Sequence, residues 1–281
     1  MISPLMLTAL LGASAALAVS PDTADSLVNP ADKNLRVRLH GELGALLPVS
    51  HTLQFSKAGT DFDLVQDGGQ DNLFFFRRIS ADLDIGSRHT IVLLYQPLTL
   101  KSSVVLEDDL LADESTFAAG TPMNFKYGFD YTRGSYLYDF QADPERELAL
   151  GLSLQIRNAT IDYQYVDGSQ QISNRNIGFV PIIKFRTRQP LAENAYWGFE
   201  ADGFYAPVSY LNGDNNEVIG AILDTNAKVG VQLNNGVDAF ASLRYIGGGS
   251  VGTNDNVTGP GDGYSKNWIQ TAALSVGFSL R

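Results

Sequence analysis

The feature that most constrains this chain is an alternation of apolar and polar residues with a period of two. It begins at residue 35 and recurs in separate segments almost to the last residue. Residues 148–157 show it most clearly, because leucine or isoleucine occupies every second position there. Successive side chains of a β-strand point to opposite faces, so the pattern predicts strands with one apolar and one polar face.

The links between these segments alternate in length. The short links are 86–89, 142–147, 189–194 and 234–238, and the longer polar links are 48–72, 106–122, 167–175, 209–216 and 248–266. Tight turns at one rim and longer loops at the other are typical of an antiparallel up-and-down barrel. With both chain ends at the rim of short turns, the number of strands must be even. We therefore predict an all-β, antiparallel transmembrane barrel of about ten strands, or about twelve if residues 51–65 add a hairpin.

The start of the chain predicts export. Residues 1–18 are uncharged, rich in apolar and small residues, and end in an Ala-x-Ala pattern at Ala16–Ala18. This is typical of a secretory signal peptide of the Sec type, although the Lys or Arg that usually opens such a segment is missing. After residue 18, no stretch of about 18 apolar residues occurs that would predict a spanning helix. A membrane-resident form must therefore be a closed barrel.

Charge and cysteine content narrow the function classes. The formal net charge is −11 and the chain contains no cysteine. A nucleic-acid partner favours a basic patch, which the sequence lacks. The absence of cysteine excludes disulfide frameworks and thiolate sites. We expect no cofactor, no metal and no nucleic-acid partner.

The polar faces of the segments carry many charges of both signs. A Lys or Arg facing lipid near the bilayer midplane costs about 2–4 kcal/mol, so we expect these faces to point into the lumen. Ion pairs across the lumen would make it a rigid strut, and the same charges would suit a narrow polar conduit for small solutes. The residues expected to face the lumen are Arg36, Arg38, His40, Glu42, Arg78, Asp82, Asp84, Asp130, Arg157, Lys184, Arg186, Arg188, Glu200, Asp202, Asp224, Lys228 and Arg244.

Aromatic residues on the apolar faces are expected at the two membrane interfaces, where an amphipathic ring can contact both lipid and water. The residues expected there are Tyr95, Tyr127, Trp197, Tyr245 and Trp268.

Together, these features resemble bacterial outer-membrane β-barrel proteins over residues 35–281, ending in the strand-like segment WIQTAALSVGFSLR. In that class the last strand usually ends in an aromatic residue, whereas Phe278 is followed here by three further residues. The resemblance implies a signal peptide at 1–18, a periplasmic lead-in at 19–34 and a barrel at 35–281. It also implies an outer-membrane location, contact with membrane lipid and lipopolysaccharide, and insertion by the barrel assembly machinery.

Two motifs carry little chemistry. Gly247, Gly249 and Gly252 fit G-x-G-x-x-G, but a dinucleotide site needs a helix after them and none is expected. Among the three histidines, His40 shares a face with Glu42, and a histidine can accept a proton from a hydroxyl or a water. No G-x-S-x-G motif accompanies it, so we expect no enzyme and leave open whether His40 has a catalytic role.

The leading hypothesis is therefore an outer-membrane barrel that is structural or passes small solutes. The alternatives are an outer-membrane barrel enzyme that hydrolyses lipid or peptide, and a soluble secreted β-barrel that binds an apolar ligand.

Overall fold

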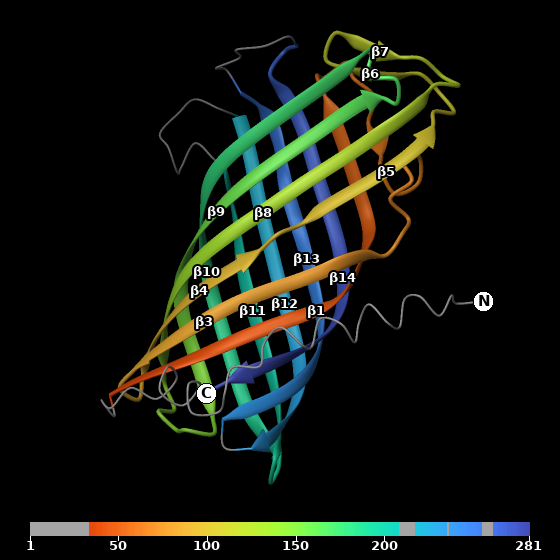
Figure 1. Ribbon diagram of the computed structural model, residues 1–281. Coiled ribbons are helices and arrows are strands. Elements are labelled where there is room, and N and C mark those ends of the chain that lie inside the picture. The colour runs from red at the N-terminus through yellow and green to blue at the C-terminus, as the bar shows by residue number, and fades with distance from the viewer. Residues whose placement is uncertain (1–33, 208–216, 235, 255–260) are drawn as a thin grey trace, which may run out of the picture.

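The computed structural model describes residues 34–207, 217–234, 236–254 and 261–281, and within these the chain forms a closed antiparallel β-barrel (Figure 1). No helix in the described residues is long and apolar enough to cross a membrane. The predicted signal peptide and all but the last residue of the lead-in lie outside the described residues. The strands of the wall are β1 (Leu35–Phe55), β3 (Phe74–Ile85), β4 (His89–Gln96), β5 (Thr99–Val105), β8 (Pro122–Asp139), β9 (Glu147–Tyr165), β10 (Gln171–Ala192), β11 (Ala195–Pro207), β12 (Glu217–Asn234), β13 (Val237–Thr253) and β14 (Tyr264–Leu280).

Neighbouring strands pair in chain order, and β14 returns to pair with β1, which closes the barrel. Strands β4 and β5 both pair with β8, so they occupy successive parts of one position in the wall. Between the end of β4 and the start of β5, the Leu98 amide donates a hydrogen bond to the carboxylate of Asp130 on β8. The barrel therefore has ten wall positions, and the prediction of ten strands is confirmed.

The short connections lie at one end of the barrel, together with the first residue of β1 and the last of β14. We call this the turn end and the opposite one the loop end. Three further strands belong to loop-end connections, namely β2 (Phe62–Asp63), β6 (Leu110–Ala112) and β7 (Ser115–Phe117). The strands are longer than predicted, so the turn expected at 189–194 shrinks to 193–194. Strand β1 continues to Phe55 through a β-bulge between Pro48 and Ser50.

The outer face of the barrel is strongly apolar. Leu152 is 68% exposed, Leu274 66% and Ile183 58%, and each lies on a strand whose alternate residues are buried. Soluble monomers rarely expose contiguous apolar surface of this extent. A soluble barrel that buries its apolar faces would show the reverse arrangement, so this outer face is the one suited to contact lipid.

The interior changes character halfway along the barrel. Its turn-end half is filled by charged side chains, whereas its loop-end half contains an apolar core. Strand β2 pairs with β1, and its first residue Phe62 and the following Leu64 are buried in that core. The loop-end half is thus closed by a segment of the first long connection.

This apolar half corrects one prediction about faces. Along β8 the alternation placed Tyr127 on the lipid side and Asp130 in the lumen, but Tyr127 is buried inside the barrel together with Phe125 and Tyr131. The polar residues between them therefore lie on the outer face. The reason is that an apolar plug requires an apolar lining, so the polar face does not point inward here.

Candidate functional site: the charged lumen of the turn-end half

An ion-pair layer crosses the lumen next to the apolar core. At its centre is the carboxylate of Asp224, whose side chain is fully buried. One of its oxygens lies 2.6 Å from Arg244 Nη1, and the other lies 3.2 Å from Arg133 Nη1 and 3.3 Å from Arg78 Nη1. Arg133 also contacts Asp202 at 2.9 Å. We call Asp224, Asp202 and the three arginines Arg78, Arg133 and Arg244 the central layer. All five side chains are almost completely buried.

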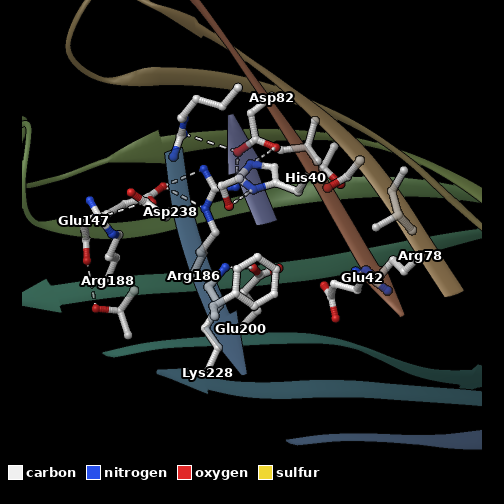
Figure 2. Close-up of a pocket in the computed structure, with 18 of the residues that line it drawn as sticks. His40, Glu42, Arg78, Asp82, Glu147, Arg186, Arg188, Glu200, Lys228 and Asp238 are labelled. Atoms are coloured by element: carbon white, nitrogen blue, oxygen red, sulfur yellow. Dashed lines mark hydrogen bonds and ion pairs between the residues drawn. The ribbon is translucent and has the colours of Figure 1, made fainter. Parts of the chain in front are cut away.

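A second group of charges lies nearer the turn end, around Asp82. Figure 2 shows Asp82, His40 and Arg186 converging on the same part of the lumen. Asp82 Oδ2 contacts Arg186 Nη1 at 2.7 Å and Arg38 Nη2 at 3.3 Å. Arg186 also contacts Glu147 at 2.7 Å. These residues come from β1, β3, β9 and β10, so the ion pairs join strands that are not all neighbours.

Lys184 lies deeper than Arg186 on the same face of β10. Its Nζ contacts Asp202 at 2.9 Å and Glu200 at 3.2 Å, and Glu200 also contacts Lys228 at 3.2 Å. The register places Lys184 opposite Asp202, and Arg186 opposite Glu200. The basic face of β10 is therefore neutralised partly by the acidic face of β11.

Two cavities open among these charges. The inner cavity, shown in Figure 2, has a volume of about 60 Å³ and reaches His40, Glu42 and Arg78. The outer cavity, of about 280 Å³, lies at the turn end beside the 86–88 and 140–146 turns. Both lie on the turn-end side of the central layer.

Most of the residues predicted for the lumen are brought together here, but two are not. Asp130 lies on the outer face of β8, because its neighbours Phe129 and Tyr131 point inward. Arg157 points inward on β9 between the buried Gln155 and Ala159, but it lies outside this network, toward the loop end. Arg36 lies at the mouth, with 43% of its side chain exposed, and contacts Asp84 at 3.0 Å.

Four members of the network were missed in the sequence. Arg133 lies on the aromatic face of β8 that the alternation had placed outward. Glu147, Asp238 and Arg281 stand at the ends of strands, where the alternating pattern is too short to assign a face. A signal for Arg133 was present in the sequence. Tyr131, Arg133 and Ser135 occupy every second position of β8 and therefore share one face, and this face changes from aromatic to polar after Tyr131.

The environment of His40 bears on the open question of catalysis. His40 lies directly opposite Ser279 in the β1–β14 register, and its Nδ1 lies 2.7 Å from Ser279 Oγ. Its Nε2 lies 3.6 Å from Asp82 Oδ1. Ser279 is 4% exposed and Asp82 is already held by two arginines. A serine, a histidine and an aspartate thus meet, in a crowded part of the lumen.

Of the five aromatic residues expected at the membrane interfaces, four lie on the outer face. Tyr95 and Trp197 are exposed there, and Tyr245 and Trp268 are half-buried. Tyr127 instead lies inside, where its ring and that of His51 form a T-shaped contact. No group of three or more potential metal ligands occurs in the described part of the chain.

At the loop end, acidic residues of different connections lie close together. Partial burial and the neighbouring carboxylates of Asp262 and Glu114 raise the pKa of Asp113. Hydrogen bonds from the Lys57 and Tyr264 amides lower the pKa of Asp262. Two loop-end connections therefore bring carboxylates close together at this end.

The sequence matches no protein-family model and no curated protein. Among solved structures, the barrel is similar to the outer membrane protease OmpT from Escherichia coli, with 9% identity, 87% of this chain and 96% of that chain covered, and a TM-score of 0.53. Neisserial surface protein A is 16% identical, over 87% of this chain and 96% of that one, with a TM-score of 0.33. The toluene transporter TodX from Pseudomonas putida is 7% identical, over 87% and 90%, with a TM-score of 0.30. At such identities only the fold is shared, and that fold is the one of the bacterial outer-membrane β-barrel proteins.

Proposed function

We propose that this protein is a structural barrel of the outer membrane whose lumen is a strut and not a conduit. The observation that carries the proposal is the central layer around Asp224, which is buried and is followed toward the loop end by the apolar core. A solute entering from the turn end would have to separate several buried ion pairs and then cross packed aromatic side chains. Leaving one such buried charge without its partner costs about 3–5 kcal/mol.

Conductance in planar lipid bilayers tests this proposal. We expect no single-channel steps from the wild-type protein or from Arg186→Ala, and a lower thermal stability for the variant. In a conduit, removing this fixed positive charge would shift ion selectivity toward cations. Conductance of the wild-type protein, with such a shift in the variant, would overturn the strut proposal.

The outer-membrane location is part of the same proposal, supported by the exposed apolar outer face. Membrane fractionation and gel mobility with and without boiling test it, because a lipid-embedded barrel stays folded in detergent until it is heated. Recovery as a soluble periplasmic protein would contradict it.

Lipopolysaccharide is the lipid partner that we propose. Lys101 and Lys126 lie directly opposite each other on β5 and β8, on the outer face and toward the loop end. Two like charges directly opposite each other destabilise a strand pair. A lipopolysaccharide phosphate bound between the two lysines would remove this repulsion. Lys126 also contacts Asp162 at 3.1 Å. Added lipopolysaccharide should raise the melting temperature of the wild-type protein more than that of Lys101→Ala; an equal rise would argue against this contact.

A hydrolase is the second candidate, favoured by the contacts of His40 with Ser279 and Asp82. His40 would accept the proton of the Ser279 hydroxyl as that oxygen attacks a carbonyl carbon, and would then donate the proton to the leaving group. A serine-reactive fluorophosphonate probe tests it: labelling that is lost in Ser279→Ala and retained in Ser275→Ala would support the enzyme. Ser275 is a matched control, because it is buried on the same face of β14. Absence of labelling would eliminate this candidate.

A further inference from the structure

The two cavities of the turn-end half share part of their lining. Arg38, Glu147, Arg188 and Arg281 contribute to both the inner and the outer cavity. These four side chains therefore form the neck between the two cavities. Three of the four are arginines, and they come from β1, β10 and the last residue of the chain.

The anions near the neck are shared among more cations than they can neutralise. Asp238, on the inner side, contacts Arg281 Nη2 at 2.6 Å and Arg188 Nη2 at 3.7 Å. One carboxylate thus faces two guanidinium groups. Glu147 is already engaged by Arg186 at 2.7 Å.

The same excess holds for the whole ion-pair network of the lumen. Ten basic side chains (Arg36, Arg38, Arg78, Arg133, Lys184, Arg186, Arg188, Lys228, Arg244 and Arg281) pair with eight acidic ones (Glu42, Asp82, Asp84, Glu147, Glu200, Asp202, Asp224 and Asp238), which leaves two positive charges. The chain as a whole carries −11. This ion-pair network is therefore cationic, although the protein as a whole is acidic; the turns beside the outer cavity add Arg88 and Arg146 but also Asp139, Asp143 and Glu145.

Two donors at the neck are not used within the described part of the protein. Arg38 Nε and Arg281 Nε are buried and have no hydrogen-bond partner in the described structure. The guanidinium carbon of Arg188 lies over the Tyr196 ring, 4.1 Å from its centroid, and its only ion pair among the described residues is the long one to Asp238 at 3.7 Å. Planar guanidinium groups bind phosphate and carboxylate through paired hydrogen bonds.

We propose that the neck binds a small, doubly charged oxyanion of the phosphate class, which enters from the turn end. The two excess positive charges match such an ion, and the inner cavity of about 60 Å³ has room for an ion of a few atoms with a little water. Because the central layer closes the lumen beyond the inner cavity, the site would bind the ion without passing it on. The inference goes beyond the structural role proposed above and does not depend on it.

Titration calorimetry with inorganic phosphate on the full chain in detergent micelles tests this inference. We expect saturable binding of one phosphate per chain, no comparable heat from chloride at equal ionic strength, and at least a tenfold weaker affinity for Arg188→Ala. Arg146→Ala is the matched control, because Arg146 lines only the outer cavity and should leave the affinity unchanged.

Two further outcomes make the test decisive. Arg188→Lys keeps the charge but loses the planar donor pair, so it should fold like the wild type and still bind phosphate more weakly. If the wild-type protein shows no saturable heat, or if Arg188→Ala and Arg146→Ala weaken binding equally, the neck is not an oxyanion site. A phosphate-dependent rise in melting temperature that Arg188→Lys reduces would support the site independently of calorimetry.

Discussion

The Asp224→Asn substitution probes the layer that closes the lumen. Asparagine has nearly the same shape as aspartate but no charge, so Arg78, Arg133 and Arg244 would surround a neutral side chain. All three guanidinium groups lie within 3.3 Å of this carboxylate, and its side chain is fully buried. Removing one partner of a buried ion pair costs about 3–5 kcal/mol because a buried charge is left without compensation. We expect the free energy of unfolding to fall by about this amount.

Urea unfolding of the protein in lipid vesicles, followed through the fluorescence of Trp197 and Trp268, measures this change. With a slope of about 2 kcal/mol per molar urea, the midpoint should fall by roughly 2 M. Asp162→Asn is the control, because Asp162 pairs with Lys126 on the outer face, where both side chains are partly exposed. Such a pair is worth about 0–1 kcal/mol. If both variants shift the midpoint equally, ion pairing does not hold the central layer together.

Two further substitutions test the wall of the barrel. Leu152→Arg places a charge on the exposed apolar face and should destabilise the protein inserted in lipid vesicles by about 2–4 kcal/mol. Leu191→Arg, near the 193–194 turn, should cost only about 0–1 kcal/mol, because it lies close to the membrane interface. Equal costs would mean that Leu152 does not lie deeper in the bilayer than Leu191. Gly151→Ala would force a methyl group against the Tyr136 carbonyl oxygen and should cost about 1–3 kcal/mol in urea unfolding, whereas Gly203→Ala makes only ordinary contacts. Equal midpoints for the two glycine variants would contradict the strand spacing described here.

The alternating pattern was enough to predict the fold, because it follows from backbone geometry alone. Residues 148–157 alternate without interruption, and β9 exposes Leu148, Leu150, Leu152 and Leu154 as expected. Strand ends were less predictable. The polar run at 51–65 looked like a link or a hairpin, yet β1 extends to Phe55 and only Phe62–Asp63 forms a second strand.

The candidate site was predictable only where one assumption holds, namely that the polar face points inward. It holds at Arg186 and Asp224, in the charged half. It fails at Asp130 and Tyr127, because the apolar core reverses the preference. No local pattern in β8 reveals that a segment more than 50 residues earlier in the chain fills the lumen beside it.

The two halves of the interior solve the same packing problem in different ways. A barrel of about eight strands is filled by ordinary side chains, so a ten-stranded one has additional volume to fill. The loop-end half fills it with Phe62 and Leu64 from an inserted segment. The turn-end half uses long arginine and lysine side chains, which must bring their counter-charges with them. Water and small ions can enter such a charged network but not an apolar plug. Any binding of ions or polar solutes in the lumen is therefore expected in the turn-end half. On β8 the boundary between the apolar core and the charged network lies between Tyr127 and Arg133.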